Sequence, residues 1–139
     1  MQIIYTATAH ATGDGRNCHA TTDDGLVDLD LSVPKEMGGP GGATNPEQLF
    51  AMGYAACFHS ALKIVAGKDA ASVEGSAVSA SVGIGSTEGG GFGLTVELDV
   101  DLPNVSGDEA EALVARAHEV CPYSNATRGN IDVALQVVS

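Results

Sequence analysis

Two of the three cysteines in this chain of 139 residues are placed where they could do chemistry. Cys57 lies in an apolar segment, and Cys121 directly precedes Pro122 at the end of a predicted helix. Most free cysteines act as small buried hydrophobic residues, and that interpretation suits each one alone. Together they suit a redox pair, because a nearby second thiol can convert an oxidised cysteine, a sulfenic acid, to a disulfide. Cys18, near a turn, has no evident partner and is interpreted as incidental.

Two Cys/His pairs raise the alternative of a metal site. Cys57 and His59 are two residues apart in a predicted helix, where such positions are about 200° apart and face opposite ways. His118 and Cys121 share a side, which leaves at most three converging ligands. Structural zinc needs four ligands. We therefore predict no metal, with both histidines as ordinary polar residues.

A thiol in an apolar pocket has a raised pKa and reacts slowly, so activation needs a cation. Of the three arginines, Arg16 follows two glycines in a loop that could approach a pocket closely. A surface ion pair is the alternative use of Arg16. To hold its guanidinium toward a thiol, a carboxylate would be needed in a bidentate pair, and Glu47 is the candidate.

The spacing between Glu47 and Cys57 favours a dimer. Ten residues of continuous helix rise about 15 Å, so Glu47 cannot reach Cys57 in its own chain unless the helix breaks. A copy from a second subunit with an antiparallel central helix could reach it. The sequence therefore predicts a two-fold homodimer with sites at the interface.

The elements that must position these residues follow from residue patterns. Residues 2–9 have β-type side chains and predict a strand, and the turn after them leads into a second one. Alternating apolar residues over 26–33 predict a half-buried strand. The residues 34–46, rich in Gly and Pro, predict a loop long enough to be functional.

A helix is predicted to follow this loop. Asn45 suits the N-cap, Pro46 the first helical position, and Gly67 the position just beyond the end. The segment between them is apolar nearly all round. That pattern indicates a helix buried at the centre of a domain or dimer.

The second half of the chain begins with two alternating segments, 78–84 and 92–102, which predict a hairpin. The residues Ser106–Glu109 resemble a capping box and predict a second helix, which Pro122 ends before a polar loop. The last strand, "IDVALQVV", also alternates. This order predicts an α+β fold, with antiparallel sheets packed around a buried central helix.

Composition limits the function. A length of 139 residues, 44% of them apolar, fits one globular domain over 1–139. The net charge of −12 disfavours nucleic acid or anionic membrane as a partner. The odd cysteine count, the absence of an evident signal peptide, and an uncharged apolar run below the roughly 18 residues of a membrane span predict a soluble cytoplasmic protein.

Three segments, "YTATAHATGDGR", "TNPEQLFAMGYAACF" and "VCPYSNATRGNIDV", together resemble the organic hydroperoxide resistance (Ohr) proteins of the wider OsmC/Ohr superfamily. The resemblance runs essentially end to end. It implies an intertwined homodimeric α+β fold and a thiol-dependent peroxidase whose sites draw on both subunits. By matching motif positions, Cys57 would be the peroxidatic cysteine and Cys121 the resolving cysteine. Arg16 with Glu47 would be the activating pair.

The resemblance also implies the substrates and the reductant. Alkyl and fatty-acid hydroperoxides would be reduced to alcohols in preference to hydrogen peroxide. The Cys57–Cys121 disulfide would be recycled by a dihydrolipoyl group, usually on a lipoylated enzyme, with no bound cofactor. Four apolar residues could line a pocket for the alkyl chain, although core packing explains each as well: Phe50, Met52, Tyr54 and Phe58. The alternative class is a non-enzymatic dimeric thiol redox sensor or small-ligand-binding module.

Overall fold

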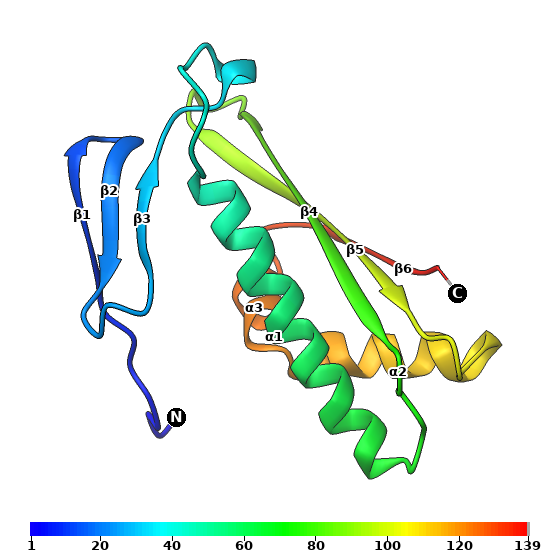
Figure 1. Cartoon of the computed structure of the whole chain (residues 1–139). Coiled ribbons are helices and arrows are strands. Elements are labelled where there is room, and N and C mark those ends of the chain that lie inside the picture. Colours follow the sequence, from blue (N-terminus) through cyan, green and yellow to red (C-terminus); the bar gives the residue numbers. More distant parts are fainter. Residues whose placement is uncertain (139) are drawn as a thin grey trace. The chain divides into compact units, whose positions relative to one another are not determined.

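A computed structural model describes residues 1–138, and the contacts within the chain divide it into two compact units, Met1–Leu49 and Phe50–Ser139. The single-domain assignment stays a prediction. The first unit contains a three-stranded antiparallel sheet in the order β1-β2-β3 (Figure 1). Its strands have the following bounds: β1 (Ala9–Asp14), β2 (Asn17–Thr22) and β3 (Asp28–Leu31).

The first strand starts later than predicted. Within the described residues, 1–8 form no strand, and β1 begins at Ala9, where pairing with Thr22 begins. The prediction of a strand over 2–9 is therefore wrong, because β-type residues form a strand only where a neighbouring strand supplies hydrogen bonds. The strand predicted over 26–33 is present in a shorter form as β3, whose Leu31 is buried.

Helix α1 (Pro46–Lys68) starts as predicted and ends later. The Asn45 side chain caps it by accepting a hydrogen bond of 2.9 Å from the backbone N–H of Gln48. At the other end Ala70 adopts a left-handed backbone, with φ of 53°, and the N–H of Ala71 donates to the carbonyl of Ala66. This is a Schellman motif with alanine in the usual glycine position. The predicted stop at Gly67 is therefore wrong, since Gly67 lies within the helix.

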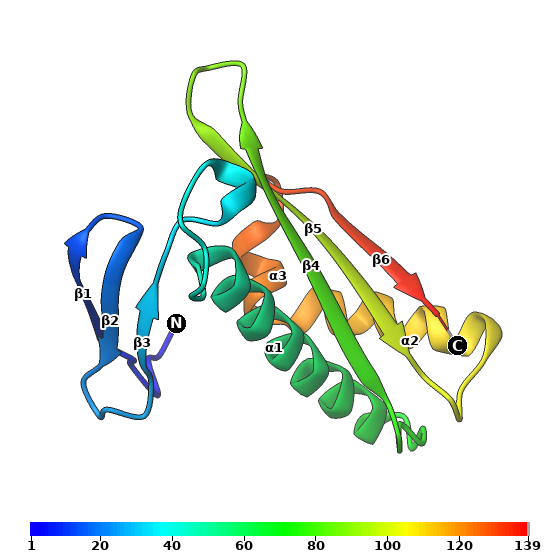
Figure 2. The ribbon, with the colours of Figure 1, turned by 45° about the horizontal axis from the view of Figure 1, so that its top comes forward.

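The second unit contains a mixed sheet of β4 (Ala77–Ser86), β5 (Phe92–Asp101) and β6 (Val133–Val137), in that order. The hairpin of β4 and β5 is antiparallel, as predicted. β6 pairs with β5 in parallel, as can be followed in Figure 2, so the prediction of antiparallel sheets is wrong at this pair. The reason is the crossover through α2 (Gly107–Val120) and α3 (Pro122–Thr127), which returns the chain to the end of the sheet where β5 began.

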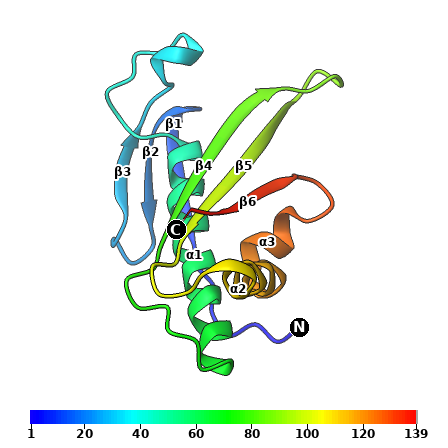
Figure 3. The same cartoon turned by 90° about the vertical axis from the view of Figure 1, so that its right-hand side faces the viewer.

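One hydrophobic core joins these elements. The buried side chains of β5 and the residue after it, Val96, Leu98, Val100 and Leu102, alternate along one face of the sheet. Buried residues of α1 and α2 belong to the same core, so both helices cover that face (Figure 3). Phe92, at the start of β5, is 75% exposed and lies outside this core.

Helix α1 buries only one face in this chain. Its buried residues include Tyr54, Phe58 and Leu62, whereas Met52 is 60% exposed and Ile64 is 57% exposed. Of the two predicted settings for this helix, the centre of a domain or of a dimer, the first is therefore not met within one chain, and burial in a dimer stays a prediction. α1 is long and apolar enough to cross a membrane by length and composition, a test that the core helix of a soluble protein also passes.

The region around α2 and α3 departs from two predictions. Within the described residues, Ser106 makes no side-chain cap hydrogen bond at the start of α2, so the capping box is wrong. Pro122 does end α2, but it also begins α3, where the sequence predicted a polar loop. Proline suits the first position of a helix because its missing N–H would be unpaired there.

The end of α1 generates a prediction. Gly67→Ala should raise the free energy of unfolding by about 0.5–1 kcal/mol, because alanine favours a helix interior and open space surrounds a Cβ at this position. Ala70→Gly should raise it by a similar amount, because glycine adopts the left-handed backbone without strain. Urea denaturation measures both changes. A loss of stability in Gly67→Ala would show that Gly67, not Ala70, forms the helix stop.

Candidate active site

Two thiols of the second unit lie in contact. Cys57 on α1 is half-buried, Cys121 at the end of α2 is fully buried, and their sulfur atoms are 3.8 Å apart. All three cysteines are free within the described chain, and Cys18 belongs to β2 of the first unit. Two free thiols at this distance can be joined as a disulfide after one of them is oxidised.

The position of Cys121 follows from the proline after it. A residue before proline is restricted to extended backbone, and Cys121 has φ of −65° and ψ of 125°. The helical pattern of α2 therefore stops at this residue, and α3 starts in a new direction with Pro122 at its first position. At this junction Cys121 is fully buried in the core.

The surroundings of Cys57 do not favour its thiolate in this chain. Burial raises the pKa of Cys57, and the neighbouring Cys121 raises it further. The backbone N–H of Tyr123 acts in the opposite direction, because a hydrogen bond to sulfur favours the charged form. Among the described residues, none of the groups that shift the pKa of Cys57 is a cation.

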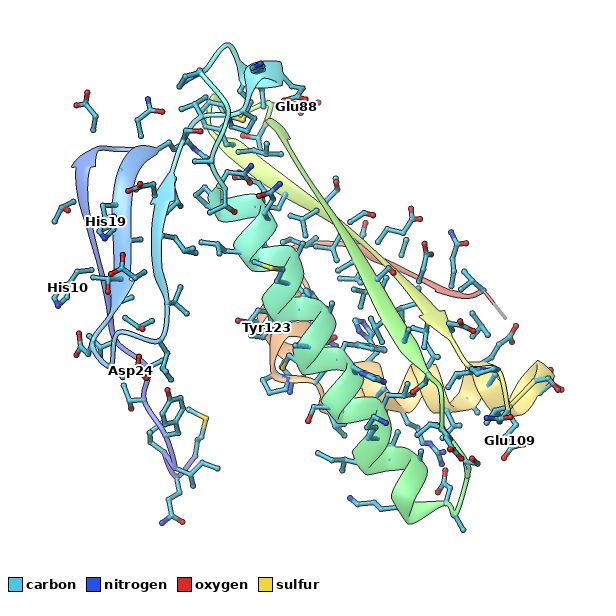
Figure 4. The ribbon with its side chains drawn as sticks, viewed as in Figure 1. His10, His19, Asp24, Glu88, Glu109 and Tyr123 are labelled. Carbon is cyan, nitrogen blue, oxygen red and sulfur yellow. The ribbon has the colours of Figure 1, made fainter. Side chains whose placement is uncertain are left out.

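Tyr123 was missed by the sequence prediction, which assigned it to a loop. Its ring packs against α1 so closely that a Cβ added at Gly53 would lie 2.8 Å from its hydroxyl oxygen. The ring centres of Phe50 and Tyr54 are 5.8 Å and 5.6 Å from that of Tyr123, which is labelled beside α1 in Figure 4. The one available signal was Pro122, since proline is frequent at the first position of a helix.

The four predicted lining residues have different surroundings. Tyr54 and Phe58 are fully buried in the core, Phe50 is half-buried among aromatic rings, and Met52 is exposed on another side of α1. The structure therefore brings Phe50, Tyr54 and Phe58 onto one side of the helix and leaves Met52 away from them. Their role as a substrate lining stays a prediction.

Arg16 and Glu47 form a bidentate ion pair in the first unit. The two guanidinium nitrogens donate to the two carboxylate oxygens at 2.9 Å and 2.7 Å. Arg16 lies in the turn between β1 and β2, where Gly15 has φ of 63°, and Glu47 lies in the first turn of α1. The Arg16 guanidinium lowers the pKa of the Glu47 carboxyl, and Glu47 raises the pKa of Arg16.

This ion pair is held firmly but is not sealed from solvent. The side chain of Arg16 is 34% exposed and that of Glu47 is 12% exposed. The two charges therefore neutralise each other, while part of the Arg16 side chain stays exposed to solvent. α1 is unbroken from Pro46 to Lys68, so the condition under which Glu47 could reach Cys57 along its own helix is not met.

Buried hydroxyl groups near Cys121 were also missed. Ser124 and Thr127 of α3 are buried, and both lie within hydrogen-bond distance of the Tyr54 hydroxyl on α1. Arg128 donates to the backbone carbonyl of His118 at 2.7 Å, so it links the end of α3 to α2. The residue types did not indicate these contacts, because serine and threonine are also common in exposed polar loops.

The histidines have polar partners. His59 lies 2.9 Å from the hydroxyl of Ser76, and His118 lies 2.8 Å from that of Ser124. His19, labelled in Figure 4, lies within 2.8 Å of two aspartates on the exposed side of the first sheet. Within residues 1–138, no three His, Cys, Asp or Glu side chains are grouped closely enough to hold a metal ion.

Comparison with known sequences gives near full-length matches. The family model of OsmC-like proteins matches residues 39–136. An organic hydroperoxide resistance protein from Xanthomonas axonopodis pv. citri is 54% identical, over 96% of this chain and 94% of the relative. The organic hydroperoxide resistance protein OhrA from Bacillus subtilis is 48% identical, over 98% and 97% of the two chains.

Comparison with solved structures gives the same result. An organic hydroperoxide resistance protein from Legionella pneumophila matches with a TM-score of 0.94 at 54% identity, over 98% of both chains. OhrB from Bacillus subtilis matches with a TM-score of 0.88 at 43% identity, over 97% of this chain and 99% of that chain. These matches confirm the α+β fold class. The chain belongs to the OsmC-like family and, within it, groups with the organic hydroperoxide resistance proteins.

Proposed function

We propose that this protein is a thiol-dependent peroxidase that reduces organic hydroperoxides to alcohols in the cytoplasm. The observation that supports it most is the distance of 3.8 Å between the sulfur atoms of Cys57 and Cys121. A peroxidatic cysteine needs a second thiol this close if its oxidised form is to be recycled. The names of the relatives, which refer to organic hydroperoxides, agree with the substrate class.

The proposed reaction has three steps. The thiolate of Cys57 attacks the terminal, hydrogen-bearing oxygen of the peroxide, and the O–O bond breaks. The alkoxide that leaves takes up a proton and becomes the alcohol. Cys57 is then a sulfenic acid, and the thiol of Cys121 displaces its oxygen as water to give a disulfide. A dithiol reduces this disulfide, returns both cysteines to thiols, and is itself oxidised to a disulfide.

Activation of Cys57 is assigned to the Arg16–Glu47 pair of a second subunit in a two-fold homodimer. A nearby guanidinium would offset the burial that raises the pKa of Cys57. Its carboxylate partner holds it in one orientation through two hydrogen bonds. The exposed apolar residues of α1, including Met52 and Ile64, support such a dimer, because burial of apolar surface drives association.

The apolar surroundings of Cys57 suit an alkyl substrate. Phe50 and the ring of Tyr123 are the aromatic groups beside this part of α1 that are not fully buried. Burial of an alkyl group contributes about 0.8 kcal/mol for each carbon, a contribution that hydrogen peroxide cannot make. We assign the reductant as a dihydrolipoyl group, free or carried on a lipoylated enzyme.

Substitution of the two cysteines tests the scheme. Cys57→Ser should abolish turnover of tert-butyl hydroperoxide, because serine does not reduce the O–O bond. Cys121→Ser should allow one oxidation of Cys57 and then its over-oxidation to sulfinic acid. Peroxide consumption and mass spectrometry of the intact protein measure these outcomes, with Cys18→Ser as the control of unchanged activity. Stoichiometric oxidation of the unsubstituted protein without turnover would instead indicate a thiol sensor.

The titration of Cys57 tests its activation. In the native protein the pKa of Cys57 should lie below the usual thiol value of about 8.5. Arg16→Gln should raise it above that value, because burial and the neighbouring Cys121 then outweigh the Tyr123 N–H. The pH dependence of iodoacetamide modification, followed at Cys57 by peptide mass spectrometry, gives the pKa. As a control, Arg116→Gln removes a different arginine and should leave the pKa of Cys57 unchanged. Equal pKa values in native protein and Arg16→Gln would exclude Arg16 as the activating cation.

The choice of substrate and reductant forms a third test. Steady-state assays should show turnover with dihydrolipoamide and little with thioredoxin. The kcat/KM for tert-butyl hydroperoxide should exceed that for hydrogen peroxide on the order of a hundredfold, if its four carbons are buried at about 0.8 kcal/mol each. Equal kcat/KM values for the two peroxides would contradict an apolar substrate site.

A further inference from the structure

Four polar side chains beside Cys121 form a hydrogen-bond network that the proposed reaction leaves without a role. We call it the Ser124 network, after its central residue. The hydroxyl of Ser124 lies 2.8 Å from both the Tyr54 hydroxyl and Nδ1 of His118. The hydroxyl of Thr127 lies 3.2 Å from that of Tyr54 and 3.1 Å from the Ser124 carbonyl. Tyr54 and Ser124 are fully buried, so water does not readily replace these bonds.

The number of available hydrogens gives the network a direction. Its four contacts need four donated hydrogens, and the three hydroxyl groups supply one each. Thr127 donates to the Ser124 carbonyl, which can only accept. Tyr54 then donates to Thr127, and Ser124 donates to Tyr54. The fourth hydrogen comes from Nδ1 of His118, which donates to Ser124.

This count fixes the chemical form of His118. Burial and the nearby Arg128 lower the pKa of His118, so its ring is neutral near pH 7. A neutral imidazole carries one hydrogen, and the network requires it at Nδ1. Nε2 of His118 is therefore without a hydrogen.

The Ser124 network bridges the junction that holds Cys121. His118 lies three residues before Cys121 on α2, and Ser124 lies three residues after it on α3. Arg128 adds a second bridge through its 2.7 Å bond to the His118 carbonyl. The backbone of Cys121 is itself restricted by Pro122, so the angle between the two helices sets the position of the Cys121 sulfur.

Tyr54 connects the same network to α1, three residues before Cys57. The network therefore contacts both elements that carry the reacting sulfur atoms. Those atoms must approach from 3.8 Å to a bond length of about 2.05 Å when the disulfide forms. A misplacement of about 1 Å at such a site can slow a reaction about a hundredfold.

We propose that the Ser124 network positions the Cys121 thiol for attack on the oxidised Cys57. In that step Cys121 loses its hydrogen, its sulfur bonds to the Cys57 sulfur, the S–O bond of the sulfenic acid breaks, and water leaves. The residues of the network are positioning residues that act through Cys121. This inference rests on the proposed function, but it concerns only the second of the three steps.

Single-turnover kinetics of Ser124→Ala separate the two steps. The rate at which Cys57 reduces one equivalent of tert-butyl hydroperoxide should stay unchanged. The rate of disulfide formation should fall at least about tenfold, because the substitution removes both hydrogen bonds of the Ser124 hydroxyl. The fraction of Cys57 over-oxidised to sulfinic acid at excess peroxide should rise accordingly. Acid quenching followed by mass spectrometry measures the three oxidised forms: the Cys57 sulfenic acid, the Cys57–Cys121 disulfide and the Cys57 sulfinic acid.

A matched control is Ser76→Ala, which removes another serine hydroxyl that contacts a histidine. That histidine is His59, which lies on α1, the helix that carries Cys57. This control should keep the native ratio of disulfide to over-oxidised Cys57. A native ratio in Ser124→Ala would overturn the inference, as would an equal fall in both rates. If the unsubstituted protein forms no Cys57–Cys121 disulfide, the proposed function itself fails, which is a distinguishable result.

Variants at His118 keep the test available if Ser124→Ala does not fold. His118→Asn retains a donor near the position of Nδ1 and should preserve most of the rate of disulfide formation, whereas His118→Leu should reduce it about as much as Ser124→Ala. The ¹⁵N NMR shifts of His118 should show a protonated Nδ1 and a bare Nε2 at pH 7. Equal rates of disulfide formation in His118→Asn and His118→Leu would contradict the network. An Nδ1 of His118 that carries no hydrogen would contradict it as well.

Discussion

The buried face of α1 is the constraint on which the rest of the second unit depends. Tyr54 and Phe58 on this face pack against β5 and the apolar side of α2. Tyr54 brings a hydroxyl group into the core, and a buried hydroxyl needs hydrogen-bond partners. Ser124 and Thr127 supply them, so the packing of α1 also determines where α3 can lie. Cys57, three residues after Tyr54, is thereby placed against the junction of α2 and α3.

The parts of the fold that the sequence predicted are those in which a residue pattern reports burial directly. Alternation over 78–84 and 92–102 identified the hairpin of β4 and β5. The direction of β6 could not be read this way, because a strand has the same pattern beside a parallel or an antiparallel neighbour. The ends of α1 show the same limit: Asn45 was a clear cap, but an alanine formed the stop.

In the candidate site, too, some residues could be predicted from the sequence and others could not. Arg16 and Glu47 could be paired from the sequence because the chain has few cations, and a guanidinium near a thiol needs a carboxylate to orient it. Tyr123 acts on Cys57 through its backbone N–H, which every residue except proline has, so its side chain gave no indication of this role. Pro122 was ambiguous, because the residue that ends one helix also suits the start of the next.

The two thiols in contact are 64 residues apart in the chain, and this separation links the redox state to stability. A covalent bond between them would close a loop of that length and remove conformational entropy from the unfolded chain. For such a loop the effect corresponds to about 4 kcal/mol. The oxidised form would thus be the harder of the two to unfold. A reductant that opens the bond would return the protein to its less stable form, and the proposed catalytic cycle would alternate between a cross-linked and an open chain.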